Sequence, residues 1–311
     1  MSQRDVKNRI ASVQNIRKIT RAMEMVAAAR LRRAEQRIER LRPYAAAIRR
    51  MTRQAAEAAG AEISSLPILK EHESVDTVAI LLVTGDRGLA GAFNSQILRA
   101  GLRAAAEHES AGRSVVFSAS GRRGVSSLTF RGREVAGGYT GFTDRPGYAN
   151  AREIAEDLMA AYIDGEIDRV EVFYNGYVSA LTQEVRHETL LPLQQASVLE
   201  EGEEGDGDEA EGRDDDGGDT RERDKRALVE YEPDPEEILR RLVPDYVEIS
   251  IYRALLESTA SEHGARMTAM RNASENAGEL IDDLTLEMNR ARQAEITQEI
   301  MEVVGGAEAL R

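Results

Sequence analysis

The sequence predicts an α/β fold combined with a long antiparallel coiled coil. The N- and C-terminal segments are expected to be the two helices of the coiled coil, with a mostly parallel α/β domain inserted between them. Two observations lead to this prediction: apolar residues recur at helical spacing over both ends of the 311-residue chain, and strand-like runs alternate with helical segments in the middle. Aromatic residues make up only 5% of the chain, so much of it must be stabilised without a thick globular core.

The first segment, residues 1–60, is predicted to be one long helix. From Ser2 to Ala59 there is no internal glycine, and at 1.5 Å per residue this stretch would be roughly 87 Å long. Pro43 is its only proline and predicts a break or kink. The apolar residues at three- and four-residue spacing are Val6, Ile10, Val13, Ile16, Ile19, Met23 and Val26, followed by Ile38, Leu41, Ile48 and Met51.

The middle segment, residues 75–195, is predicted to be a Rossmann-like α/β domain. A continuous apolar run, 78–84, is typical of a buried parallel strand, and further strands are expected at 114–119, 170–174 and 184–190. Helices are expected at 94–109, around 124–128 and at 149–163. This alternation favours a mostly parallel sheet.

Residues 197–230 are predicted to be an acidic, disordered insertion. The whole chain has a net charge of −14, but residues 200–226 alone carry 14 acidic and 5 basic side chains. Such a segment buries too little apolar surface to offset its chain entropy. Residues 1–60 are the opposite, with 15 basic and 5 acidic side chains, so different segments are expected to meet different partners.

The last segment, residues 240–311, is predicted to be the second long helix. A heptad seam runs back from its far end through Ala291, Met288, Leu284, Ile281, Ala277, Ser274, Met270, Met267, His263, Ala260 and Leu256. Two such helices at opposite ends of one chain pack most simply as an antiparallel left-handed coiled coil. The alternative is that each is a separate surface helix of an ordinary bundle, although helices in globular domains average only about three turns.

The composition excludes several classes of protein. There is no cysteine, hence no disulfide, no cysteine-ligated zinc or iron–sulfur site and no thiol switch. No apolar run approaches the ~18 residues of a membrane span, and the first residues lack the apolar core of a secretory signal. We therefore expect a reducing, cytosolic compartment.

The sequence contains no clear catalytic or ligand-binding motif. The turn Gly85–Asn94 follows a strand and precedes a helix, as a nucleotide-binding turn does, but it matches neither common phosphate-binding pattern. A tight turn at a topological switch point is the better interpretation, with a nucleotide-dependent α/β enzyme as an alternative. No catalytic, cofactor-binding or metal-ligating residue is predicted, because the histidines lack ligand spacing: His72, His108, His187 and His263.

The basic first helix has two interpretations. Arginine-rich helices bind nucleic acid electrostatically, but here the arginines flank an apolar stripe and Tyr44 is the only aromatic residue. Complementarity to acidic loops of a protein partner explains the same charge, so no nucleic-acid partner is predicted.

Four motifs together resemble the gamma subunit family of F-type ATP synthases, the central rotor shaft of those complexes. They are Ile16–Arg30 (IRKITRAMEMVAAAR), Gly85–Asn94 (GDRGLAGAFN), Ser258–Ala273 (STASEHGARMTAMRNA) and Arg290–Ile300 (RARQAEITQEI). They lie in both terminal helices and in the middle domain, so the resemblance spans essentially the whole chain. A coiled-coil adaptor of an unrelated assembly is the alternative from another class.

The resemblance implies a non-catalytic subunit of the ATP synthase complex, a rotary motor for ion (hydrogen ion) transport and ATP synthesis. Its implied partners are three alpha and three beta subunits around the coiled coil, the epsilon subunit beside the α/β foot, and the c-subunit ring. The implied location is peripheral, on the cytoplasmic face of the inner cell membrane, with no transmembrane segment and no cofactor of its own.

The residues implied to contact the beta subunit lie in both terminal helices: Met23, Glu24, Arg292, Gln293, Thr297 and Glu299. If the helices run antiparallel, Met23 is expected to lie level with residues near 290. The acidic segment lies where photosynthetic relatives carry a regulatory insertion. Without cysteines, thiol switching there is excluded, and we expect a solvated spacer, with a brake as the alternative.

Overall fold

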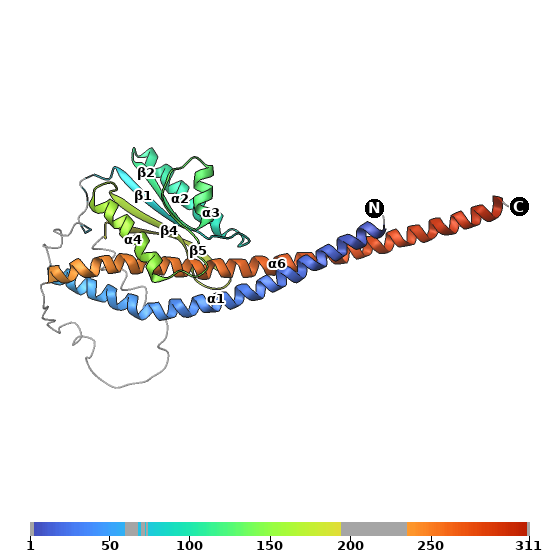
Figure 1. The fold of residues 1–311 in the computed structure, drawn as a ribbon, viewed down its shortest axis with the longest axis horizontal. Helices are drawn as coiled ribbons and strands as arrows, with labels where there is room; N and C mark the ends of the chain where they lie inside the picture. The colour runs from blue at the N-terminus through green and yellow to red at the C-terminus, as the bar shows by residue number, and fades with distance from the viewer. Residues whose placement is uncertain (1–2, 60–67, 70–71, 73, 194–234, 310–311) are drawn as a thin grey trace, which may run out of the picture.

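Two long helices lie side by side and carry an α/β domain along one half of their length (Figure 1). The structure is a computed structural model that describes residues 3–59, 68–69, 72, 74–193 and 235–309; the predicted acidic insertion therefore lies outside the described residues. Helix α1 spans Gln3–Ala59 and helix α6 spans Pro235–Ala309. Together they form the predicted antiparallel coiled coil, which we call the shaft.

The predicted break at Pro43 is absent. Helix α1 runs through Pro43, and α6 likewise runs through Pro244. An internal proline removes one helical hydrogen bond and costs about 3 kcal/mol, so something must hold the helix on both sides. In α1 this is tertiary packing: Ala45 and Ile48 are buried against the domain, with Leu41 packed beside them.

The seam of α6 is as predicted, but the seam of α1 is not. All eleven seam positions of α6, from Leu256 to Ala291, are buried or half-buried. In α1 the buried positions follow a strict heptad that passes through Thr20 and Ala27, which leaves four predicted stripe residues exposed: Ile16 (52%), Ile19 (59%), Val26 (53%) and Met51 (47%). The buried or half-buried seam of α1 is Val6, Ile10, Val13, Thr20, Glu24, Ala27, Leu31, Ala34, Ile38, Leu41, Ala45, Ile48, Thr52 and Ala55.

The middle domain is a five-stranded sheet in the order β3-β2-β1-β4-β5. Strands β1 to β4 are parallel and β5 is antiparallel to β4. Because the chain moves outward from β1 to β3 and then returns to the other side of β1, the loop after β1 lies at the switch point that the sequence predicts. The strands are β1 (Thr77–Val83), β2 (Ser114–Ser120), β3 (Val135–Tyr139), β4 (Arg169–Tyr177) and β5 (Gln183–Leu191).

Helices cover both faces of this sheet. On one face, α2 (Phe93–Ser110) and α3 (Arg122–Phe130) bury Ile97 and Leu128 against the outward side chains of β1 and β2. On the other, α4 (Tyr148–Ile163) and α6 contribute Ile154 and Ile251 to a second core, which α1 joins through Ile48. Helix α6 is therefore half of the shaft and also one layer of the domain.

Two further features of the fold differ from the sequence prediction. Strand β3 was not expected, because its sequence Val-Ala-Gly-Gly-Tyr has little strand character; it is held by pairing with β2. The register of the shaft also differs and is described below. Among the described helices, none combines the length and the apolar character that crossing a bilayer requires.

Candidate functional site

The predicted contact residues lie at two heights along the shaft. Met23 and Glu24 are half-buried, Met23 beside the seam of α1 and Glu24 in it, and Glu24 accepts a 3.0 Å hydrogen bond from Nε of Arg271. The other four residues, Arg292, Gln293, Thr297 and Glu299, are exposed on α6, where Thr297 Oγ1 donates to the backbone oxygen of Gln293 at 2.8 Å.

The expectation that Met23 lies level with residues near 290 is wrong. Glu24 pairs with Arg271, and the guanidinium of Arg17 lies over Gly278. Continued at this spacing, the start of α1 is level with about Arg292, so the two groups of contact residues are about 30 Å apart. The seam cluster near the start of α1 agrees with this register, because it joins Val6 and Val13 to Ala277 and Leu284.

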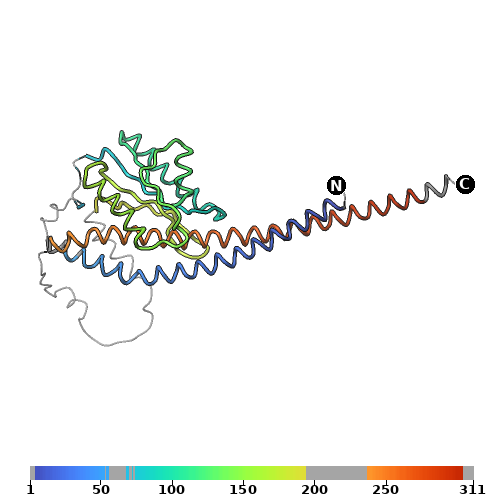
Figure 2. Tube along the Cα trace, in the orientation of Figure 1, coloured from blue at the N-terminus to red at the C-terminus, as the bar shows by residue number. Residues whose placement is uncertain are grey.

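Beyond Arg292 the shaft is a single helix. Figure 2 shows α6 continuing past the N-terminal end of α1. This C-terminal extension, residues 292–309, is about 27 Å long and contains the four exposed contact residues. The side chains of residues 292–303 are all exposed, so this part of the extension packs against no other described segment of the chain.

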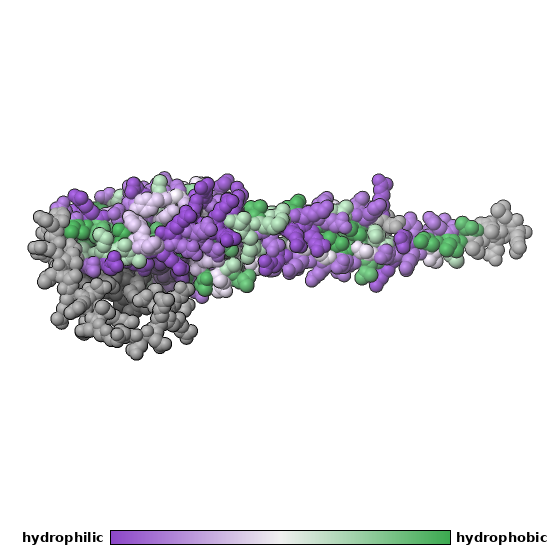
Figure 3. All heavy atoms as spheres, turned by 90° about the horizontal axis from the view of Figure 1, so that it is seen from below, coloured by the Kyte–Doolittle hydropathy of each residue, from purple (hydrophilic) through white to green (hydrophobic). Residues whose placement is uncertain are grey.

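Exposed apolar side chains continue along the paired part of the shaft. We call the paired stretch formed by residues 3–24 and 271–291 the distal shaft. Hydrophobic patches alternate with hydrophilic ones along the shaft in Figure 3. Because this surface is apolar but narrow, it is typical of a contact surface between subunits. In the distal shaft the large exposed residues are Ile16, Ile19, Leu280 and Leu286; Met25 and Val26 lie just beyond it on α1, and Ile296, Ile300, Met301 and Val303 lie on the extension.

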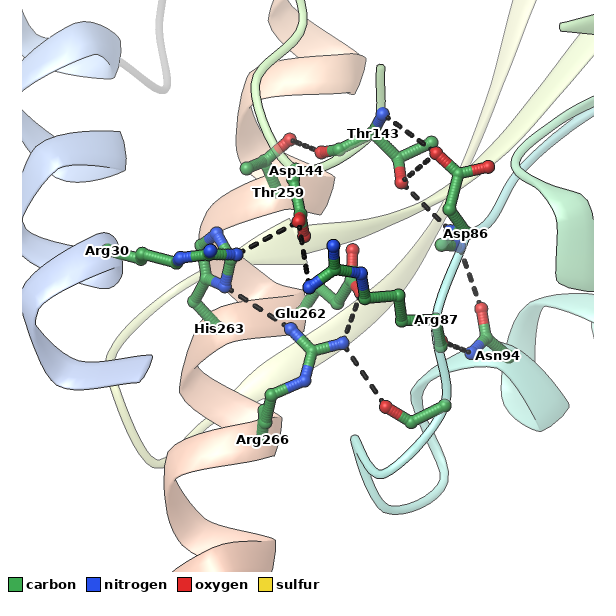
Figure 4. A network of polar contacts seen from close by, with 12 residues as sticks. Arg30, Asp86, Arg87, Asn94, Thr143, Asp144, Thr259, Glu262, His263 and Arg266 are labelled. Atoms are coloured by element: carbon green, nitrogen blue, oxygen red, sulfur yellow. Dashed lines mark hydrogen bonds and ion pairs between the residues drawn. The ribbon is translucent and has the colours of Figure 1, made fainter. Parts of the chain in front are cut away.

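A polar network, the junction network, joins the shaft to the domain (Figure 4). Arg30 of α1 donates to Asp144 of the β3–α4 loop at 2.9 Å, and Arg87 of the β1–α2 loop lies 3.5 Å from the same carboxylate. Thr259 of α6 donates to the backbone oxygen of Thr143 in that loop at 2.9 Å. Four separate segments therefore meet at this junction.

Within the network, the pair Glu262–Arg266 fixes the β1–α2 turn against α6. Glu262 is 1% exposed and accepts from Arg266, which also donates to the backbone oxygen of Gly88 at 3.3 Å. A Cβ on Gly85 would lie 2.7 Å from Oε1 of Glu262, so a larger residue there would displace this carboxylate. The helix and the turn are thus fitted to each other.

Burial sets the ionisation of this part of the network. Burial raises the pKa of Glu262, and the charge and hydrogen bond of Arg266 offset this only in part. Burial also lowers the pKa of His263 to about 4, helped by the positive charge of Arg266. At neutral pH, His263 is therefore a neutral side chain in the seam.

Asp86 holds the turn together from the inside. Burial alone would raise its pKa, but hydrogen bonds from the backbone amides of Gly141, Arg122 and Thr143 lower the pKa below its usual value. In addition, the amide of Gly85 donates to Asn94 Oδ1 at 2.8 Å. Two carboxylates, Asp86 and Glu262, therefore lie at this turn, and their negative charge disfavours a bound phosphate.

The three histidines outside the junction network lie beside carboxylates at two places in the domain. His72 Nδ1 lies 2.6 Å from Asp168, whereas His108 and His187 lie 3.2 and 2.9 Å from the buried Glu171. Over the described part of the chain, no group of three or more His, Cys, Asp or Glu residues is arranged to hold a metal ion.

Sequence reasoning did not find the junction network. The motifs Gly85–Asn94 and Ser258–Ala273 were both noted, but nothing in the spacing shows that they meet. The available signal was the run Glu262, His263, Arg266 inside an apolar seam, because charged residues at such positions are buried only with partners.

Sequence comparison relates the chain to one family over its full length. A family model described as ATP synthase matches residues 2–310. The ATP synthase gamma chain of Rubrobacter xylanophilus is 43% identical over 309 residues, covering 99% of this chain and 98% of the relative. A sodium ion specific ATP synthase gamma chain from Acetobacterium woodii is 38% identical over 306 residues and 98% of each chain.

Solved structures share this architecture. A chain in the central stalk and c-ring structure of the Tetrahymena thermophila mitochondrial ATP synthase is 26% identical, with a TM-score of 0.57, over 82% of this chain and 99% of that one. A chain of the Euglena gracilis mitochondrial ATP synthase has a TM-score of 0.66 at 19% identity, over 99% of this chain and 94% of that one, and so shows the fold alone.

Proposed function

Because the chain belongs to the ATP synthase gamma chain family, we propose that its shaft turns inside a ring of three alpha and three beta subunits. It is a central-stalk rotor subunit that couples ion flow through the membrane sector to ATP synthesis or hydrolysis on the beta subunits. In the proposal, the α/β domain is the foot, held with an epsilon subunit against a c-subunit ring. The complex lies on the cytoplasmic face of the cell membrane, with this chain as a peripheral part.

The observation that carries the proposal is the shape of the shaft. A rod transmits torque only if it is anchored at one end and presents an asymmetric surface at the other. Here the anchor is the junction network together with the core shared by α1, α4 and α6. The asymmetric end is the C-terminal extension, which projects beyond its partner helix.

The proposed contacts with the beta subunit lie away from the anchored end of the shaft. Met23 and Glu24 lie at one height and present a side of the paired shaft, whereas Arg292, Gln293, Thr297 and Glu299 lie on the extension. Contacts at two heights along the shaft transmit torque to a surrounding subunit more effectively than contacts at one height. Glu24 is engaged with Arg271, so we expect it to act by holding that arginine in place rather than as a free carboxylate.

We further propose that the subunit has no catalytic site of its own. Support comes from the β1–α2 turn, where Asp86 and Glu262 place carboxylates in the position that a phosphate would need. Phosphoryl transfer requires donors and cations there instead. Nucleotide bound stoichiometrically and with magnesium at Gly85–Asn94 of the isolated chain would contradict this part of the proposal.

Reconstitution tests the rotor function. Alpha, beta and epsilon subunits combined with this chain are expected to hydrolyse ATP at a rate that depends on the chain, and to pump ions once joined to the membrane sector. If the alpha–beta complex has the same hydrolysis rate with and without the chain, the proposal fails.

Met23→Lys tests the proposed contact. It introduces a cation beside the seam, where the shaft meets beta, so we expect fewer ions pumped per ATP hydrolysed while assembly is preserved. Ala22→Lys is the matched control, because Ala22 is exposed on the same turn, lies outside the exposed apolar surface and receives the same charge. Equal coupling in the two variants would remove Met23 from the contact surface.

A further inference from the structure

A cleft on the side of α1 gathers five arginines around one hollow of about 570 Å³. We call it the arginine cleft. Its arginines are Arg30, Arg33, Arg37 and Arg40 of α1 and Arg145 of the β3–α4 loop, and its other lining residues are Ala34, Gln36, Asp144, Leu256, Thr259 and His263. The four arginines of α1 are three or four residues apart, which places them on one face of the helix.

The described residues do not neutralise the positive charge in this cleft. Asp144 is the only carboxylate among the described residues that line it, and that group already pairs with Arg30 and with Arg87. Within the described residues, no ion pair or side-chain hydrogen bond is made by the other four: Arg33, Arg37, Arg40 and Arg145. Like charges held this close repel one another and lower the stability of the empty cleft.

We propose that the arginine cleft binds a compact polyanion carrying two or three phosphate groups. Guanidinium groups bind phosphate oxygens in pairs with fixed geometry, and here they face a common hollow from two elements of the fold. The volume lies within the range of small-molecule sites. Asp144 Oδ1, which is buried and has no hydrogen-bond partner, can accept from a protonated phosphate oxygen.

The shape of the cleft favours a polyphosphate over an acidic peptide. From Arg30 to Arg40 the helix rises only about 15 Å, so the cations are concentrated over a short length. An extended peptide has a rise of about 3.3 Å per residue and points successive side chains to opposite sides, which spreads its carboxylates too thinly. A linked chain of phosphates supplies the required charge within the cleft.

Such a ligand would connect α1 to the β3–α4 loop. Among the described residues, the ion pair or side-chain hydrogen bond that makes this connection is Arg30 with Asp144. An anion shared by Arg145 and the arginines of α1 adds a second connection and removes their mutual repulsion. Binding is therefore expected to raise the melting temperature, since a ligand of the folded state stabilises it by mass action.

Inorganic tripolyphosphate is the probe for the test, used with the full-length chain at low ionic strength in calorimetric titration and thermal melts. We expect one bound tripolyphosphate per chain and a higher melting temperature. Arg33→Gln/Arg37→Gln is expected to weaken binding by about tenfold or more, given the strength of charge-assisted hydrogen bonds. Without ligand, this variant is expected to melt no lower than the unmodified chain.

Arg32→Gln/Arg50→Gln is the matched control, since these exposed arginines lie on the same helix outside the cleft and the charge change is equal. Equal weakening in both variants would show general charge screening and overturn the proposal, as would the absence of binding to the unmodified chain. A third outcome would also overturn the proposal. If tripolyphosphate binds only after residues 200–226 are deleted, and a peptide of that sequence displaces it, the site binds an acidic peptide instead.

Discussion

The two halves of the shaft are held together by different means. Beside the domain, α1 and α6 are joined by the junction network and by a core that includes Ile48 and Ile251. In the distal shaft the seam is narrow, with a small cluster around Val13 and Leu284 and one partly exposed ion pair between α1 and α6, Glu24–Arg271, among the described residues. One half is therefore a broad, buried anchor, whereas the other is slender and exposed.

The largest expected effect is on the anchor. Glu262→Ala leaves Arg266 buried without its partner, so we expect a loss of about 3–5 kcal/mol in the free energy of unfolding. Urea unfolding of the full-length chain, followed by circular dichroism, measures it. Replacing both residues with apolar side chains, Glu262→Leu/Arg266→Met, is expected to recover most of the loss. A loss below about 1 kcal/mol in Glu262→Ala would show that the pair does not hold the junction.

The second largest loss of stability is expected from a substitution in the seam of the distal shaft. Leu284→Ala removes a side chain that is 5% exposed and should cost about 2–3 kcal/mol. Because the distal shaft has no second layer, we expect hydrogen exchange to accelerate in residues 4–20 and to stay slow in strand β1. Leu280→Ala, at a position 43% exposed, is the control with almost no effect. Equally fast exchange in β1 would mean that the two halves unfold as one unit.

Acid is expected to weaken the anchor through His263. Its folded pKa is about 4, below the 6.5 of the unfolded chain, so as pH falls from 7 to 5 only the unfolded state takes up the proton. Relative to His263→Gln, the unmodified chain should lose about 2 kcal/mol over this range.

The variant comparison is needed for this pH effect because other charged groups surround His263: Arg30 on α1, Asp144 in the β3–α4 loop, and Glu262 and Arg266 on α6. The raised pKa of Glu262 acts in the opposite sense, since the folded state then takes up that proton first. Urea titrations at pH 7, 6 and 5 measure the difference. Parallel pH profiles for the two proteins would show that His263 is not held neutral.

The smallest effect is expected at the distal ion pair. The side chains of Glu24 and Arg271 are 22% and 49% exposed, so Glu24→Gln should change the free energy of unfolding by less than about 1 kcal/mol. Urea unfolding of the full-length chain measures this change as well. A loss as large as that of Glu262→Ala would remove the distinction between the two halves.

Much of this architecture could be predicted from the sequence, because periodicity and local composition determine it. The α6 seam from Leu256 to Ala291 and the apolar run of β1 are local patterns, and the structure contains both. The α1 stripe was misassigned because Ile16, Ile19 and Val26 are apolar and helically spaced but lie outside the heptad. Two apolar faces on one helix cannot be told apart by spacing alone.

The parts that could not be predicted depend on contacts between distant segments. The pairing of Glu24 with Arg271 depends on the axial register between the two helices. Neither helix's sequence pattern defines that register. The junction network likewise requires Arg30, Asp86, Asp144 and Glu262 to converge from four segments. The beta contacts on Met23 and on the extension stay predictions that follow from family resemblance.

Rotation of the domain tests the central claim most directly. The assembled alpha–beta complex is fixed to a surface through its beta subunits, a bead is attached to the α/β domain of this chain, and ATP is added. The account predicts that the bead turns in one direction and pauses at positions set by the three beta subunits. A bead that stays still while the same complexes hydrolyse ATP would contradict it.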